Sequence, residues 1–196
     1  MAKEIDKIIG LLLGIIALVL IVITFFVNLA TITDKVSYLG FSYSQTTNTT
    51  FFGSSYAGHY SSWSNLTKGM TGSELAKATS GVDMIYASIA TMVLAAIFVV
   101  LGIITAFAGF SGMLKKIAIL FPILSAIFII LTIVLYYEGA TTIVNAMKTA
   151  VPAGYLFSTT ISLAVGAYLA IGALILELLV VIFNFLGFGK AKASKN

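Results

Sequence analysis

The sequence predicts an all-α membrane protein, a left-handed four-helix transmembrane bundle with a small β-rich extracellular cap from the first loop. Three observations predict it. Four apolar stretches each exceed the roughly 20 residues that a helix needs to cross the hydrocarbon core, and none contains Lys, Arg or His. Hydrophobic residues make up 60% of the chain and charged residues 9%, which leaves too little polar surface for a soluble domain. The longest segment outside these stretches is rich in Ser, Thr, Gly and Tyr.

We expect a single membrane domain over residues 1–196, and its parts can be placed along the chain. The predicted parts are spans at about 8–30, 84–110, 117–137 and 157–188, an outer loop cap at 31–82, and a second outer loop at 138–156. The first span is longer than the apolar core of a typical secretory signal, so we interpret it as an uncleaved anchor.

The lysines predict the orientation. With both termini cytoplasmic, the inner lysines are Lys3, Lys7, Lys115, Lys116, Lys190, Lys192 and Lys195, and the outer ones are Lys35, Lys68, Lys77 and Lys148. The inner set is larger and lies close to span ends, where positive charge favours the cytoplasmic side. We therefore expect a multi-pass cell-membrane protein with its first and third loops outside.

The first outer loop has the composition of a small sheet. Aromatic and apolar residues alternate partly with small polar ones, which predicts short strands separated by turn-prone breaks at 46–50 and 53–55. Thr71-Gly-Ser-Glu74 matches a capping box and predicts a short helix from Gly72 to Thr79 that ends at Gly81. Asp83 is then expected to cap the second span.

Three residues of this loop are candidate functional positions. Asn48 and Asn65 each begin an Asn-x-Thr sequon and are candidate glycosylation sites, although a loop rich in Ser and Thr also generates sequons by chance. Trp63 is the only tryptophan, and we interpret it as the buried anchor of the cap rather than as a ligand platform.

Small or hydroxyl-bearing residues recur every seven positions in the spans, which keeps one seam of each helix facing its neighbours. The predicted helix-packing glycines are Gly10, Gly14, Gly102 and Gly166. The spacing of Gly10 and Gly14 also fits a close-approach dimer motif, but with 17 glycines in the chain we favour packing within one molecule.

Three polar residues are predicted to lie inside the membrane, namely Glu177, Ser125 and Asn184. Glu177 is the only ionisable residue deep inside a span, and such residues often handle protons or cations. The alternative, which we favour, is a protonated carboxyl that hydrogen-bonds a hydroxyl on a facing helix. Ser125 should lie at a similar depth.

The chain lacks most of the residue types that do chemistry. It has no Cys, and His59 is the only histidine, so neither a thiolate site nor a His-based metal cluster can be built. No phosphate-cradling glycine loop is present. All 11 basic residues are Lys, which gives no indication of nucleic-acid binding. We expect no enzyme activity and no cofactor or metal.

The layout resembles the claudin and peripheral-myelin-protein tetraspan superfamily. The shared features are an inner amino terminus, a first outer loop of about 50 residues with strand-like composition and Trp63, a tight inner turn at 111–116, a short second outer loop and a lysine-bearing inner tail. The two loop cysteines of that family are missing, and Ser61-Ser62-Trp63-Ser64 keeps only its tryptophan. The resemblance implies a left-handed bundle topped by a small sheet, with loops that mediate adhesion, barrier formation or partner binding.

Three function classes remain open. The first is a structural or adhesion-type tetraspan that self-associates and uses its first outer loop for contacts. The second is an accessory subunit of a larger respiratory or transport complex, in which other membrane subunits are the partners. The third is a proton- or cation-coupled channel or carrier that uses Glu177, and it is the weakest because no other ionisable residue and no inverted repeat is present in the spans.

Overall fold

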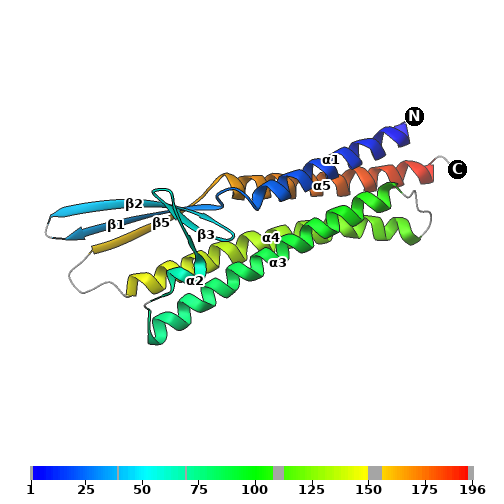
Figure 1. The fold of residues 1–196 in the computed structure, drawn as a ribbon. Coiled ribbons are helices and arrows are strands. Elements are labelled where there is room, and N and C mark those ends of the chain that lie inside the picture. The colour runs from blue at the N-terminus through cyan, green and yellow to red at the C-terminus, as the bar shows by residue number, and fades with distance from the viewer. Residues whose placement is uncertain (1, 39, 69, 108–112, 150–155, 194–196) are drawn as a thin grey trace. The chain divides into compact units, whose positions relative to one another are not determined.

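The computed structural model describes residues 2–38, 40–68, 70–107, 113–149 and 156–193, and this part of the chain is mostly helical with one small antiparallel sheet (Figure 1). Its helices are α1 (Ala2–Thr24), α2 (Trp63–Leu66), α3 (Gly72–Phe107), α4 (Met113–Thr149) and α5 (Val165–Ala193). Its strands are β1 (Ala30–Tyr38), β2 (Phe41–Thr50), β3 (Gly53–Tyr56), β4 (His59–Ser62) and β5 (Leu156–Leu163).

Three of the helices contain stretches long and apolar enough to cross a membrane. These stretches are Gly72–Ala106 in α3, Ile119–Thr149 in α4 and Val165–Asn184 in α5, and an 18-residue segment within each has a mean hydropathy of 2.7, 2.7 and 2.5, respectively. The apolar part of α1, Ile8–Thr24, is shorter. The three long helices indicate a membrane-embedded protein.

The chain forms two compact units, and helices α3 and α4 each contribute residues to both of them. One unit, here called the helical unit, comprises Met1–Ile23, Ala90–Leu131 and Leu169–Asn196. The other, here called the sheet unit, comprises Thr24–Ile89 and Thr132–Tyr168.

Close side-chain contacts link the four helices of the helical unit. Gly14 of α1 faces Ile103 of α3, where an added Cβ would lie 3.3 Å from Ile103 Cγ1. Phe98 of α3 stacks on Phe121 and Phe128 of α4, with ring centroids 6.2 Å and 5.5 Å away. A similar contact joins α5 to α1, because a Cβ at Gly172 would lie 3.4 Å from Leu20 Cδ1. Van der Waals packing at these close contacts holds the helices of this unit together.

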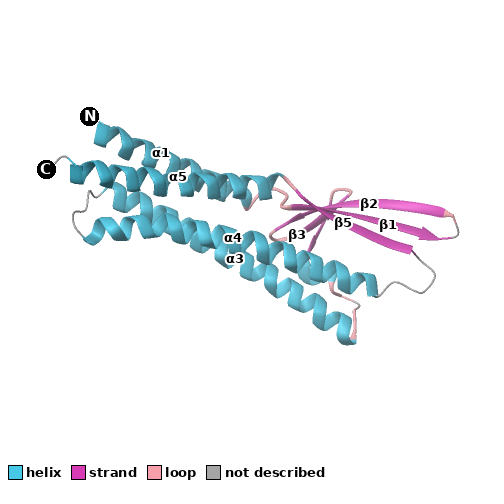
Figure 2. Cartoon of the chain, turned by 180° about the vertical axis from the view of Figure 1, so that it is seen from behind, coloured by secondary structure: helices cyan, strands magenta, loops and turns pink. Residues whose placement is uncertain are grey.

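The sheet of the sheet unit has five strands in the order β4-β3-β2-β1-β5, all antiparallel to their neighbours. Figure 2 draws its strands in magenta. Four strands come from residues 30–62, as the alternating pattern of the first loop predicts. The fifth, β5, begins 94 residues after the end of β4 and pairs with β1 from Ser37↔Leu156 to Ala30↔Leu163. This strand was not predicted from the sequence.

The fourth predicted span is wrong at its start, because residues 157–163 are extended and α5 begins only at Val165. The segment Leu156–Leu163 places Ser158, Thr160 and Ser162 at alternate positions, and this two-residue period suits a strand with one polar face. Hydropathy alone did not distinguish this strand from the apolar helix that follows it. The first predicted span is likewise too long, since α1 ends at Thr24 and Ala30 opens β1.

The boundaries of the second and third spans are also wrong. Instead of a short helix that ends at Gly81, one helix runs from Gly72 to Phe107, so Asp83 lies inside α3 and caps no span. Helix α4, which contains the third predicted span, continues past Tyr137 to Thr149, through most of the predicted second outer loop. Residues 113–116 of the predicted inner turn belong to α4, while 108–112 and 150–155 lie outside the described residues.

The physical reason for the continuity of α3 is a close helix crossing. A Cβ added at Gly81 would lie 2.7 Å from the backbone oxygen of Gly139, and one at Gly139 would lie 2.7 Å from that of Gly81. The two glycines therefore let the backbones of α3 and α4 touch, and Gly81 is used for packing rather than for ending a helix.

The turns of the sheet also differ from the predicted ones. Residues 46–50 belong to β2 and 53–55 to β3, where the hydroxyl-rich sequence is extended rather than turned. The chain reverses instead at Gly40, with φ of 85°, and at Ala57-Gly58, with φ of 48° and 82°. Left-handed backbone at both central positions suits the two-residue turn between β3 and β4.

Candidate functional sites: the sheet surface and the Glu177 cavity

An aromatic cluster holds the sheet on α4 within the sheet unit. Phe51 and Trp63 are 0% and 1% exposed, and both rings meet the ring of Tyr136 edge-on, at centroid distances of 5.7 Å and 6.3 Å. Trp63 Nε1 donates a hydrogen bond of 3.1 Å to Thr50 O. The expected anchor Trp63 thus lies at the point where β2 and β3 join α4.

Tyr136 is the member of this cluster that the sequence analysis missed. Its hydroxyl donates to Thr49 Oγ1 at 2.8 Å and approaches Thr50 O at 3.2 Å, while Thr49 Oγ1 donates to Ala30 O at 2.8 Å. One phenol therefore links α4, β2 and β1. A tyrosine near the end of an apolar stretch was the available signal, since such residues place one polar group at an interface.

The sheet has one face made mostly of hydroxyl groups, here called the hydroxyl face. Its side chains on the three longest strands are Thr31, Thr33, Lys35 and Ser37 of β1, Ser42, Ser44, Thr46 and Asn48 of β2, and Leu156, Ser158, Thr160 and Ser162 of β5. All are exposed or half-buried. Neighbouring members pair across the strands, as Thr31 Oγ1 donates to Asn48 Oδ1 at 3.3 Å and the Thr33 and Thr46 hydroxyls lie 3.4 Å apart. This face is built to meet water or a polar partner.

The opposite face changes character along β1 and β2. At one end of the strands, Ala30 and Ile32 are 1% and 7% exposed and form part of the core. At the other end, next to the β1–β2 turn, Tyr38, Phe41 and Tyr43 are 45%, 83% and 56% exposed. These three side chains, here called the aromatic tip, form a cluster of large exposed apolar groups beside the turn between β1 and β2.

The remaining loop residues singled out from the sequence lie at the surface. Asn48 is exposed on the hydroxyl face, Asn65 is exposed on α2, and His59 is exposed at the start of β4. Tyr43 and Tyr56 share a hydrogen bond of 2.9 Å between their hydroxyls. This bond to Tyr56 raises the pKa of Tyr43 above its ordinary value of 10.0.

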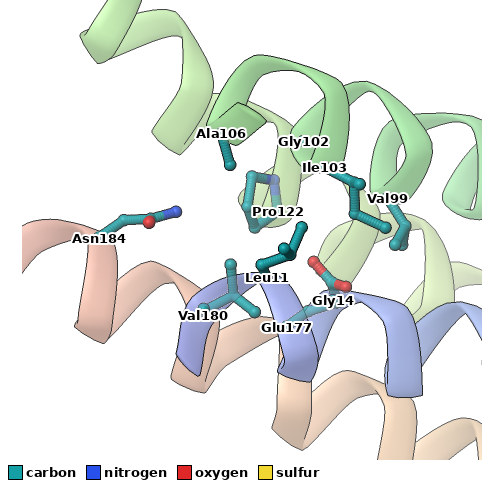
Figure 3. Close-up of a pocket in the computed structure, with 11 residues that line it drawn as sticks. Leu11, Gly14, Val99, Gly102, Ile103, Ala106, Pro122, Glu177, Val180 and Asn184 are labelled. Carbon is teal, nitrogen blue, oxygen red and sulfur yellow. The ribbon is translucent and has the colours of Figure 1, made fainter. Parts of the chain in front are cut away.

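Glu177 lies at a cavity in the helical unit, where α1, α3, α4 and α5 all contribute walls (Figure 3). The side chain is 1% exposed, and its Oε1 has no hydrogen-bond partner. Lining residues include Gly10, Leu11 and Gly14 of α1, Val99, Gly102, Ile103 and Ala106 of α3, Pro122 of α4, and Val180 and Asn184 of α5. Three of the four predicted packing glycines and two of the three predicted intramembrane polar residues are therefore found at one cavity.

The other predicted positions lie elsewhere. Ser125 is fully buried, its hydroxyl has no hydrogen-bond partner, and it is not among the residues that line this cavity. Gly166 belongs to the sheet unit, where an added Cβ would lie 2.8 Å from Asn28 O. The expected hydrogen bond from Glu177 to a hydroxyl on a facing helix is not formed at Oε1.

The described residues contain no cluster of three or more His, Cys, Asp or Glu side chains that could hold a metal ion. The sequence matches no protein-family model and no curated protein. The fold defines the class, a membrane-embedded helical protein with an antiparallel sheet.

Proposed function

We propose that the chain is a non-enzymatic structural or adhesion-type protein of the cell membrane, which self-associates and makes its contacts through the sheet. The observation that carries the proposal is the aromatic tip. Exposed aromatic residues next to polar ones are typical of the energetic centres of protein interfaces. Phe41, at 83% exposure, is the most exposed large hydrophobic residue of the described part of the sheet.

The proposal includes α1 as a fourth span, in a left-handed bundle with α3, α4 and α5. Its apolar part, Ile8–Thr24, would extend about 25 Å at 1.5 Å per residue, close to the thickness of the hydrocarbon core. Contacts of α1 with Ile103 of α3 and with Gly172 of α5 support its place in the bundle. Both termini are then cytoplasmic, and the sheet with its sequons at Asn48 and Asn65 is outside.

This arrangement keeps the layout of a claudin-like tetraspan without its disulfide. Four strands come from the segment between α1 and α3, and one comes from the segment between α4 and α5. This supports a single cap built from both outer segments. The β1–β5 pairing and the contacts of Trp63 and Tyr136 hold the cap in place of a cross-link. The sequons on exposed residues allow glycosylation of the same surface.

Native mass spectrometry of the tagged protein, purified from its own membrane in mild detergent, tests this function. We expect homo-oligomers of the 20.8 kDa chain. A stoichiometric complex with other subunits would instead make it an accessory subunit, and a strict monomer would contradict self-association.

A further inference from the structure

The Glu177 cavity combines a buried carboxyl with walls that provide few hydrogen-bonding groups and no opposite charge. Oε1 is shielded from bulk solvent and accepts no hydrogen bond from the protein. Leaving a buried acceptor unpaired is costly, so native structures usually supply a partner. Asn184, the other polar side chain of the described lining, lies two helical turns further along α5 and points into the cavity beside α1 rather than at the carboxyl (Figure 3).

The size and chemistry of the cavity limit what that partner can be. The cavity volume is about 10 Å³, close to the smallest that holds one water molecule. A metal cation would require about six oxygen ligands, which the described walls do not provide. They also contain no Lys, Arg, His, Asp or second Glu that could oppose the charge of an ionised carboxyl.

We infer that the cavity is a binding site for a single water molecule, which donates a hydrogen bond to the carbonyl oxygen of the Glu177 carboxyl while that carboxyl stays neutral. The glycines at Gly10, Gly14 and Gly102 keep the walls back and leave the space that this water occupies. The site is independent of the aromatic tip. It makes Glu177 a hydrated internal acid within the helix packing.

The glycines provide variants that fill the cavity without disturbing the backbone. A Cβ at Gly102 would lie 3.7 Å from Phe121 Cβ and Pro122 Cδ, which is ordinary van der Waals contact. Gly102→Ala therefore adds one methyl group to the cavity wall and displaces the water. Gly172→Ala is the matched control, because its Cβ also fits, at 3.4 Å from Leu20, but it lies outside the cavity.

A double-mutant cycle on the full-length protein in detergent separates a wet cavity from a dry one. In the wild-type background we expect Gly102→Ala to lower the apparent Tm by about 2–4 °C, because Glu177 loses its partner. In the Glu177→Leu background no acid needs the water, so the same substitution should raise Tm, as alanine does at Gly172 in both backgrounds. An identical Tm shift for Gly102→Ala in the two backgrounds would overturn the inference.

Infrared spectroscopy gives a second measurement that does not depend on the stability of the leucine variant. The C=O stretch of neutral Glu177 is identified by its loss in Glu177→Gln. We expect Gly102→Ala to move this band to higher frequency, since the C=O group loses its hydrogen bond, and we expect Gly172→Ala to leave it in place. A band that Gly102→Ala does not move, or a neutral carboxyl band that is absent from the wild type, would also overturn the inference.

Discussion

At the residue scale, Tyr136 shows how one hydroxyl can link a helix to a sheet. Tyr136→Phe keeps the ring contacts with Phe51 and Trp63 but removes the hydrogen bond to Thr49 and the contact with Thr50. We expect a loss of about 1–2 kcal/mol in the free energy of unfolding, because a buried acceptor loses its donor.

Chemical denaturation in detergent measures this loss. Tyr137→Phe is the control. The Tyr137 side chain is 40% exposed, so this substitution should change stability by less than about 0.5 kcal/mol. Equal effects of the two substitutions would show that the Tyr136 hydroxyl contributes nothing.

Also at the residue scale, the hydrogen bond between Tyr43 and Tyr56 makes a pH prediction for the sheet. It raises the pKa of Tyr43 by favouring the neutral phenol, so its contribution to stability is present below pH 10 and is lost as the pH rises through the folded-state pKa. In Tyr56→Phe we expect the pKa of Tyr43 to fall back toward 10.0. Titration of ring-labelled tyrosines by NMR measures the change, and an unaltered pKa would contradict the assigned cause.

At the element scale, the helical glycines differ in how closely they let neighbouring helices approach. The seven-residue pattern placed Gly102 at a tight seam, but a Cβ fits there, whereas Gly81 and Gly139 face each other across α3 and α4. Periodicity identifies the side of a helix that faces its neighbours, and several seam residues, including Ala17, Ser88 and Ala95, are fully buried. It does not give the distance between two helices, which depends on where their axes cross.

This difference predicts unequal effects of alanine. Gly139→Ala should lower the free energy of unfolding by about 1–3 kcal/mol, since its Cβ would overlap backbone that cannot move alone. Gly172→Ala should raise it by up to about 1 kcal/mol through helix propensity. Thermal unfolding of both variants in the same detergent provides the comparison. A stabilised Gly139→Ala variant would rule out the close crossing.

Strand β5 shows why the sequence predicted most of the helices but only part of the sheet. The apolar cores of the helices and the alternation of residues 30–62 are local signals, so both were visible in the sequence. The pairing of β5 with β1 is a long-range contact, and the apolar residues of β5 run directly into those of α5. The hydroxyl face and the aromatic tip depend on register between strands and could not be predicted before the pairing was known.

At the scale of the whole molecule, the lysine distribution predicts the topology. We expect Lys68 and Lys77, both exposed, to react with a membrane-impermeant amine reagent on intact cells, and Lys115 and Lys116 to react only after permeabilisation. Peptide mass spectrometry measures the labelling at each site. Labelling of Lys115 and Lys116 on intact cells, with Lys68 and Lys77 protected, would reverse the orientation.

The central claim for the molecule is that it self-associates through the aromatic tip, and the most direct test is to measure the dissociation constant of the purified protein with and without Phe41. If Phe41 lies at an interface, Phe41→Ser should weaken self-association by roughly 30-fold or more, the effect expected of an aromatic hot spot. Phe52→Ser is the matched control, because Phe52 is also exposed, at 50%, but lies at the β2–β3 turn outside the tip. The account predicts a large loss for Phe41→Ser and little change for Phe52→Ser. Wild-type affinity in the Phe41→Ser protein would contradict it.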